Sequence, residues 1–245
     1  IDKSIDAYLG MVNMVMGEQL YFAKYGKYRY SSFDEVEKLV YSNIGYMTDY
    51  MIGLGLSQFL WYNHHQLFSF FKETIGRCKG AEYLEIGTGH GFFFMEAIKS
   101  GAFQRYSGVD VSAASLRLTK AMVSKFVNKF DKYVLINKDI FKFDDEPIYD
   151  FIAMGEVLEH VEHPERFLAQ IRNLLKKGGK AYISTCANAP TIDHIYHFAS
   201  IDEIRSMIKQ SGFSVESEIT ISVDNIPEEK WEDSKTNLTY AAILT

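Results

Sequence analysis

The sequence predicts an α/β fold: a seven-stranded, mostly parallel sheet with an antiparallel last strand, preceded by an N-terminal helical extension. Three observations carry this prediction. From Ala81 onward, short apolar runs alternate with amphipathic helical patterns, which is typical of a parallel sheet covered by helices on both faces. Two strand-like segments near the end of the chain have no helix between them, so they must pair antiparallel. The first 76 residues show helical patterns and no strand-like alternation.

The helical extension covers residues 1–76. Apolar residues recur close to a 3.6-residue period between Ile5 and Leu20, as on one face of a helix. Ser32 followed by Glu35 has the spacing of a capping box at the start of a second helix. A third helical pattern over residues 48–74 is apolar on most faces, which indicates burial or an interface. We therefore interpret residues 1–76 as a lid or a dimerisation element.

Five short, mostly apolar and often β-branched runs have the texture of buried parallel strands. They cover residues 83–86, 106–109, 133–136, 149–154 and 181–184. Ser112 is suited to cap the helix after the second run. Pro164 suits the first position of a later helix, which Gly178 and Gly179 are expected to end.

A second capping box, Ser200 with Glu203, begins the last helix, and Gly212 is expected to close it. Residues 213–223 and 237–245 then form the two final strands. The sheet is therefore expected to have five parallel strands, followed by a helix and an antiparallel pair.

Composition limits the classes of partner. The formal net charge is −6, so the chain offers no general attraction to nucleic acid, and we expect no such partner. The longest apolar stretch, residues 50–62, is shorter than the ~18–20 residues a bilayer needs, so we expect no membrane association. Cys78 and Cys186 are too few for a disulfide framework, which favours a cytoplasmic location.

The first strand ends in a glycine-rich turn with the sequence EIGTGHG, residues 85–91. Glycines at alternate positions let the backbone turn tightly and approach a ligand closely, and the following helix start offers free N–H groups. Nicotinamide and flavin sites prefer G-x-G-x-x-G with a pyrophosphate above the helix. Here Glu85 would repel a pyrophosphate, but it suits a ligand that carries a cationic amino group.

Two further acids end neighbouring strands. Asp110 follows the second strand and is placed to accept hydrogen bonds from two ribose hydroxyls. Asp139 closes the third strand, where a carboxylate can accept from an exocyclic amine. An adenosine whose 5′ substituent is zwitterionic rather than phosphorylated fits all three acids.

On these motifs, residues ~80–245 resemble the class I S-adenosylmethionine-dependent methyltransferases, which have a Rossmann-like sheet. The segment GEVLEHV at residues 155–161 closely resembles the one after strand four in the small-molecule branch of this family. The resemblance implies S-adenosyl-L-methionine as the cofactor and residues 77–245 as the domain that binds it. The cofactor-binding residues that it implies are Glu85, Gly87, Thr88, Gly89, Gly91, Asp110, Val111, Asp139, Ile140, Gly155 and Glu156.

Two differences from the motifs of related enzymes argue against certain substrates and cofactors. The segment after strand four is not the Asn/Asp-Pro-Pro-aromatic motif of enzymes that methylate nucleic-acid amines, so DNA modification is disfavoured. The acids with which catechol-type relatives bind Mg²⁺ are not present in that form, so we expect no metal.

Methylation of an oxygen needs a proton acceptor, and His is the usual residue near neutral pH. His194 and His197 follow the fifth strand, and active sites of open α/β sheets form at the carboxyl ends of strands, so we predict both as catalytic residues. Asp193 is placed to orient a neighbouring imidazole. The alternative is that this loop only packs its aromatic residues against the core. We interpret His160 and His163 as structural.

Aromatic residues make up 15% of the chain, and much of their excess lies in the helical extension. In the resembled family such helices commonly cover the cofactor cleft. We therefore predict methyl transfer to an oxygen of a small organic molecule in an aromatic-lined pocket under this lid. The alternatives are methylation of nitrogen or carbon, modification of protein or RNA, an inert cofactor-binding or partner-binding domain, and a nicotinamide oxidoreductase. The same helices suit a homodimer interface equally well.

Overall fold

The computed structural model describes residues 2–127, 131–143, 146–223, 226–231 and 235–245. Its centre is a seven-stranded sheet in the order β3-β2-β1-β4-β5-β7-β6. Strands β1 to β5 pair in parallel, whereas β7 pairs antiparallel with both β5 and β6. The predicted fold class, including the antiparallel last strand, is confirmed. The strands are β1 (Gly80–Ile86), β2 (Phe103–Asp110), β3 (Tyr133–Asn137), β4 (Tyr149–Gly155), β5 (Leu175–Ala187), β6 (Val215–Ser222) and β7 (Leu238–Leu244).

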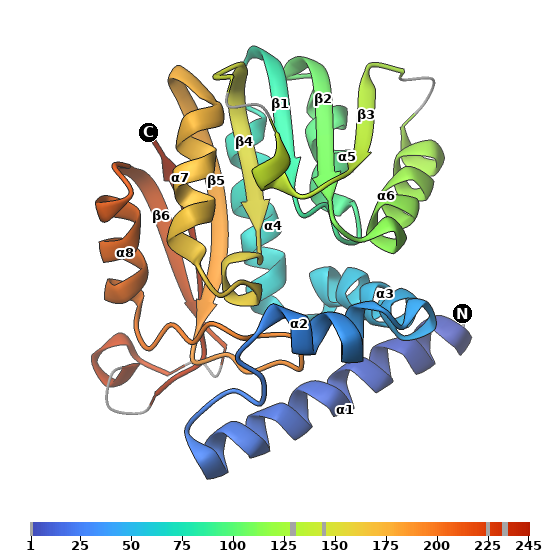
Figure 1. Cartoon of the computed structure of the whole chain (residues 1–245), viewed down its shortest axis with the longest axis vertical. Helices are drawn as coiled ribbons and strands as arrows, with labels where there is room; N and C mark the ends of the chain where they lie inside the picture. The colour runs from blue at the N-terminus through green and yellow to red at the C-terminus, as the bar shows by residue number, and fades with distance from the viewer. Residues whose placement is uncertain (1, 128–130, 144–145, 224–225, 232–234) are drawn as a thin grey trace.

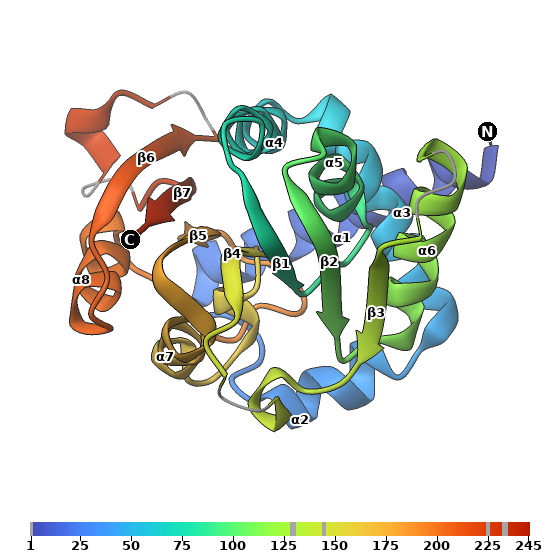
Figure 2. The ribbon, with the colours of Figure 1, turned by 90° about the horizontal axis from the view of Figure 1, so that it is seen from above.

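Helices cover both faces of the sheet, with α7 and α8 on one face and α4, α5 and α6 on the other (Figure 2). The helices are α1 (Asp2–Tyr25), α2 (Phe33–Val36), α3 (Ile44–Leu60), α4 (Tyr62–Ile75), α5 (Phe92–Ser100), α6 (Ala113–Phe126), α7 (Pro164–Leu174) and α8 (Ile201–Gln210). Shorter helical turns are η1 (Glu37–Tyr41), η2 (Ile140–Lys142), η3 (Leu158–His160) and η4 (Glu228–Lys230).

Each face of the sheet has its own hydrophobic core, as β4 illustrates. Ile152 and Met154 pack on the side of α7 and α8, whereas Phe151 and Ala153 pack on the side of α4 and α5. Successive side chains of a strand point to opposite faces, so a strand covered on both sides must be apolar throughout. This explains why β4 reads as an unbroken apolar run in the sequence.

Helices α1 to α3 lie across the carboxyl ends of the strands, below the arrowheads in Figure 1. They share a third hydrophobic cluster, in which Met11 of α1 and Val40 of η1 pack with Met47 and Met51 of α3. In the part of the chain that the structure describes, no helix combines the length and apolarity needed to cross a bilayer. The extension therefore covers the sheet edge where ligands of open α/β sheets bind.

The helical pattern over residues 48–74 proves to be two helices, so the prediction of one long helix was wrong. Trp61 has extended backbone angles, φ −102° and ψ 127°, and separates α3 from α4. Its indole N–H donates a hydrogen bond to the hydroxyl of Tyr8 over 2.9 Å, which ties the break to α1. The break lets α3 cross the strand ends while α4 packs against the sheet through Leu67, Phe71 and Ile75.

The end of α7 also differs from the prediction. The helix ends at Leu174 and β5 begins at Leu175, so Gly178 and Gly179 lie inside this long strand rather than at a helix end. Leu174 and Leu175 are both buried in the core. The chain changes from helical to extended backbone at Leu175.

Two of the three predicted caps form. The hydroxyls of Ser112 and Ser200 each accept a hydrogen bond, over 3.2 Å, from the backbone N–H three positions on. At Ser32 the hydroxyl instead donates to the carboxylate of Glu35 over 3.2 Å and caps no backbone group. Helix α2 has only four residues, and the chain continues as the π-helical turn η1.

Candidate functional site

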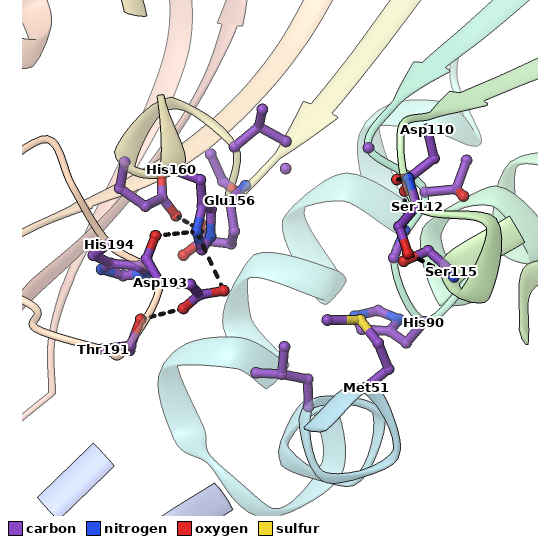
Figure 3. A pocket seen from close by; sticks show the side chains of 18 of the residues that line it. Met51, His90, Asp110, Ser112, Ser115, Glu156, His160, Thr191, Asp193 and His194 are labelled. Carbon is purple, nitrogen blue, oxygen red and sulfur yellow. Dashed lines mark hydrogen bonds and ion pairs between the residues drawn. The ribbon is translucent and has the colours of Figure 1, made fainter. Parts of the chain in front are cut away.

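A cavity of about 1260 Å³ lies between the carboxyl edge of the sheet and helices α1, α3 and α4. Polar side chains gather on two opposite sides of it (Figure 3). We call these the loop side, formed by residues 85–90, 110–115 and 138–140, and the histidine side, formed by residues 156–160 and 186–194. Met51 of α3 projects between them.

Ten of the eleven predicted cofactor-binding residues line this one cavity, although four segments of the chain supply them. The parallel order of β1, β2, β4 and the turn after β3 brings these segments to the same sheet edge. The ten residues are Glu85, Gly87, Thr88, Gly89, Asp110, Val111, Asp139, Ile140, Gly155 and Glu156.

Gly91 is the predicted cofactor residue that does not line the cavity; it precedes α5 instead. Its φ of +81° is left-handed, and an added Cβ would lie 2.6 Å from Cα of Thr119. A side chain is excluded at Gly87 for the same reasons: φ is +73°, and a Cβ would lie 2.7 Å from Cγ2 of Val157. Both glycines are therefore needed for the course of the turn itself.

Asp110 fixes the end of β2 to this turn. Its carboxylate accepts hydrogen bonds from the backbone N–H of Ser112 over 2.8 Å and of Gly89 over 3.2 Å. Burial raises the pKa of Asp110 to about 6, and these N–H groups offset part of that effect. The carboxylate is thus held rigidly beside the exposed side chain of Val111.

Glu85 is a buried carboxyl at the end of β1. It accepts a hydrogen bond from the hydroxyl of Tyr83 over 2.6 Å. Burial raises its pKa to about 8 despite this bond. A buried acid of this kind stabilises a positive charge placed beside it.

Asp139 and Ile140 form the far end of the loop side. Asp139 caps η2, because its carboxylate accepts a hydrogen bond from the backbone N–H of Phe141 over 3.0 Å. Ile140 is buried and contributes an apolar surface to the cavity. A carboxylate and an apolar side chain therefore lie next to each other at this end of the cavity.

Glu156 lies on the histidine side, away from the loop side (Figure 3). Its backbone has a left-handed φ of +52°, which is strained for a residue other than glycine. Its N–H donates to the carbonyl of Ser184 over 3.0 Å, which holds this conformation. Among the described residues, its Oε1 has no hydrogen-bond partner. Burial, and then the neighbouring Glu159, raise its pKa.

Half-buried His160 forms a pair with buried Asp193. Nδ1 of His160 lies 3.0 Å from the carbonyl oxygen of Asp193 and 3.4 Å from its Oδ2. Because a carbonyl can only accept, Nδ1 carries the proton and Nε2 keeps its lone pair. Burial alone would lower the pKa of His160, but Asp193 and Glu159 raise it overall. Burial alone would raise the pKa of Asp193, but His160 and His194 lower it overall.

The structure places the two predicted catalytic histidines in different surroundings. His194 lines the cavity, with Nδ1 2.6 Å from the carbonyl oxygen of Ala189 and its ring edge-on to His160. Burial lowers its pKa to about 3. His197 does not line the cavity: its Nε2 lies 2.8 Å from Oδ1 of Asn188, and its ring packs on Phe22.

Several residues of the histidine side were missed or undervalued in the sequence. His160, interpreted there as structural, is half-buried in the cavity wall beside Asp193. Glu159 is fully buried, and its Oε2 accepts a hydrogen bond from the hydroxyl of Thr185 over 2.6 Å. The available signal was the pattern of two acids three positions apart, followed at once by His160, directly after a buried strand.

Comparison with known proteins identifies the family. A model described as a methyltransferase domain matches residues 62–218, which is more than half of the chain. The ubiquinone biosynthesis O-methyltransferase of Leptothrix cholodnii is 24% identical over 122 residues, covering 50% of this chain and 51% of that protein. The one of Nitrosococcus oceani is 30% identical over 111 residues, covering 45% and 46%. The chain thus spans about half the length of these curated relatives.

Solved structures share the fold at low sequence identity. The N-methyltransferase NodS of Bradyrhizobium japonicum superposes with a TM-score of 0.61 at 12% identity, covering 83% of this chain and 97% of that one. Phosphoethanolamine N-methyltransferase 2 of Haemonchus contortus, solved with S-adenosyl-L-methionine, gives 0.62 at 14%, covering 89% and 60%. This chain therefore belongs to the methyltransferase-domain family and carries a class I S-adenosylmethionine-dependent methyltransferase domain.

Proposed function

We propose that this protein transfers the methyl group of S-adenosyl-L-methionine to an oxygen atom of a small organic molecule. One observation carries the proposal: a single cavity joins the loop side, suited to the cofactor, with a buried cluster of proton acceptors on the histidine side. Its volume of about 1260 Å³ exceeds the ~300–1000 Å³ of an ordinary ligand pocket, so cofactor and acceptor fit together.

The loop side fits the cofactor by its chemistry. Asp110 would accept from ribose hydroxyls, Asp139 would lie toward the adenine, and Glu85 would stabilise the cationic end. The left-handed turn through Gly87 and Gly89 leaves backbone rather than side chains facing the ligand. The bound cofactor supplies an electrophilic methyl group on a sulfonium; the protein supplies alignment and charge.

The acceptor would occupy the histidine side of the cavity. Aromatic and apolar side chains from the helical extension close this part, including Tyr41, Tyr50 and Trp61. Such a wall excludes water and favours a flat or apolar acceptor. This supports a lid role for residues 1–76 over a cofactor-binding domain of residues 77–245.

His160 is the proton acceptor that the geometry favours. Its Nδ1 is held by Asp193, which leaves Nε2 free to take the proton of an acceptor hydroxyl. His194, one of the two histidines predicted from the sequence, is the second candidate because its ring touches His160 inside the cavity. His197 is no longer proposed, because it faces Asn188 and Phe22 instead.

Nitrogen is the second candidate for the methylated atom. Glu156 and Glu159 are buried on the histidine side, and each has one oxygen without a hydrogen-bond partner among the described residues. An amine acceptor would bind beside these carboxylates as a cation and give its proton to one of them, so that the nitrogen lone pair can attack the methyl group. The relatives named for O-methylation support oxygen, whereas the solved N-methyltransferases share only the fold.

A homodimer through the helical extension is proposed as well. Apolar side chains of α1 outside the cavity are exposed, namely Ile5, Leu9 and Leu20. A second copy of the chain would cover them. Size-exclusion chromatography with light scattering measures the mass directly, and a monomer at micromolar concentration would contradict this proposal.

Calorimetry followed by a turnover assay tests the main function. Binding of S-adenosyl-L-methionine and S-adenosyl-L-homocysteine, with no response to NAD, is expected. Phenols, catechols and aliphatic amines are then offered with radiolabelled cofactor, and labelled product is expected from a hydroxyl compound. Product from amines alone would move the assignment to nitrogen. Cofactor binding without any product would favour an inert binding domain.

A further inference from the structure

Three side chains with metal-binding atoms meet at the inner wall of the histidine side. Glu159 belongs to η3, Cys186 to the end of β5, and His194 to the loop after β5. All three are buried, and their ligand atoms lie within 4.8 Å of one another. Sγ of Cys186 lies 3.9 Å from Nδ1 of His194; because Nδ1 donates its proton to the carbonyl of Ala189 over 2.6 Å, Nε2 is the ring atom with a lone pair for a metal.

Glu159 points to a missing positive partner. One of its oxygens accepts from Thr185, but Oε1 has no hydrogen-bond partner among the described residues, although the residue is fully buried. The nearest positive candidate is Nε2 of His160, 4.0 Å from Oε1 and beyond hydrogen-bonding distance. Burying a carboxylate oxygen without a partner is costly, and a bound cation would supply that partner.

We propose that Glu159, Cys186 and His194 bind a divalent transition-metal ion, with zinc as the expected metal. Carboxylate, thiolate and imidazole together are a zinc ligand set, whereas Mg²⁺ prefers oxygen ligands alone. The two positive charges of the ion would balance one carboxylate and one thiolate. Zinc bonds of about 2.0–2.3 Å place donor atoms about 3.3–3.7 Å apart, so the widest pair must close by roughly 1 Å.

A second group of residues with metal-binding atoms consists of His160, Asp193 and His194. It is the weaker candidate for a metal site. Both oxygens of Asp193 already accept hydrogen bonds, one from Tyr50 over 3.1 Å and the other from Tyr41 over 3.3 Å. A metal there would displace these bonds. Glu159 offers an oxygen that is not engaged.

Three protein ligands leave a fourth position, and all three line the cavity, so that position opens toward the acceptor. This role rests on the proposed O-methylation: an acceptor hydroxyl bound to the ion would lose its proton more readily, and His160 would take that proton. The sequence-based expectation of no metal considered only the catechol-type ligands and did not bring these three segments together.

The metal content of the full chain tests the site without an activity assay. Purified protein is stripped with a chelator, incubated with zinc, dialysed and measured by mass spectrometry; about one zinc per chain is expected. Replacement with Co²⁺ should give the near-ultraviolet charge-transfer band of a thiolate–cobalt bond. Absence of retained zinc, or retention of Mg²⁺ alone, would overturn the proposal.

Matched variants locate the ion. Cys186→Ser should lose the thiolate–cobalt band and most of the zinc, and Glu159→Gln should lose most of the zinc. Cys78→Ser is the control, because Cys78 precedes β1 at the opposite edge of the sheet and its thiol donates to the carbonyl of Thr74. Retained calorimetric binding of S-adenosyl-L-methionine verifies that each variant is folded. A band that survives in Cys186→Ser would overturn the assignment.

The metal site and the proposed function can fail separately. Stoichiometric zinc in a protein that methylates no hydroxyl compound would support the site and contradict O-methylation. Methylation of a hydroxyl compound by protein that binds no zinc would support the function and overturn the site.

Discussion

The hydroxyl of Tyr50 donates a hydrogen bond to the carboxylate of Asp193 over 3.1 Å, although 143 positions separate the two residues. Tyr50 belongs to α3, and Asp193 belongs to the loop that leaves β5. Tyr41 donates a second bond to the same carboxylate over 3.3 Å. The helical extension is therefore fastened to the histidine side through one buried acid, which also holds His160.

Tyr50→Phe is expected to lower the free energy of unfolding by about 1.5–3 kcal/mol, because it removes a buried hydrogen bond to a charged group. Denaturant unfolding measures this change. Tyr46→Phe is the matched control, since Tyr46 stacks on Tyr50 and is 37% exposed. Equal effects of the two substitutions would contradict the special role of Tyr50.

Asp110→Asn is expected to weaken binding of S-adenosyl-L-methionine by about 10-fold to 150-fold, because a charge-assisted hydrogen bond contributes about 1.5–3 kcal/mol. Isothermal titration calorimetry gives the dissociation constant. Asp202→Asn, on the exposed side of α8, should leave it unchanged. An unaltered affinity in Asp110→Asn would mean that the ribose lies elsewhere.

The raised pKa of Glu85 predicts that the protein releases a proton from this side chain when the cofactor binds. Burial raises the pKa of Glu85 from 4.5 to about 8, so the free protein holds this side chain largely protonated at about pH 7. A cationic ligand favours the carboxylate, so affinity should rise as pH increases from about 6 to about 8. Asp110, with a pKa of about 6, is half protonated at the lower end of that range, so the rise in affinity between about pH 7 and about pH 8 reports Glu85.

Calorimetry in two buffers of different ionisation enthalpy measures the released proton. The observed heats should differ between the buffers for the native chain and agree for Glu85→Gln. Equal heats for the native chain would rule out a cationic group beside Glu85.

His160→Gln is expected to reduce kcat by about 10²-fold to 10⁴-fold while cofactor affinity stays unchanged, because a general base acts in the chemical step. His197→Gln should retain near-native turnover, since His197 does not line the cavity. A steady-state assay with the identified acceptor separates the two. Full turnover by His160→Gln would exclude it as the proton acceptor.

Gly91→Ala is expected to destabilise the fold by about 1–3 kcal/mol or more, because φ is +81° and the new Cβ would lie 2.6 Å from Cα of Thr119. Gly10→Ala should have the opposite sign, since an added Cβ there meets no atom within 4 Å and α1 gains about 0.5–1 kcal/mol. Thermal unfolding compares the two. A neutral Gly91→Ala would contradict the strained turn.

The loop side was predictable because each of its segments stands at the end of a strand, which is a local signal in the sequence. The turn at residues 85–91 and the acid Asp110 each stand at a strand end, and parallel strands bring such ends to one edge. The division at Trp61 was not predictable from periodicity, because the residues on either side continue the same apolar pattern. At the break, Trp61 donates a hydrogen bond to Tyr8, a contact 53 positions away that periodicity cannot reveal.

The sequence by itself determined the sheet, the antiparallel last strand and the residues of the loop side, because hydrophobic periodicity and glycine turns are local signals. Only the tertiary structure decided which histidines face the cavity. His194 and His197 are three positions apart and looked equivalent, yet one lies beside His160 and the other beside Asn188. Glu159 and Cys186 meet His194 only because β4 and β5 pair in parallel and deliver their carboxyl ends side by side. Such proximity depends on long-range packing, which spacing along a single chain does not encode.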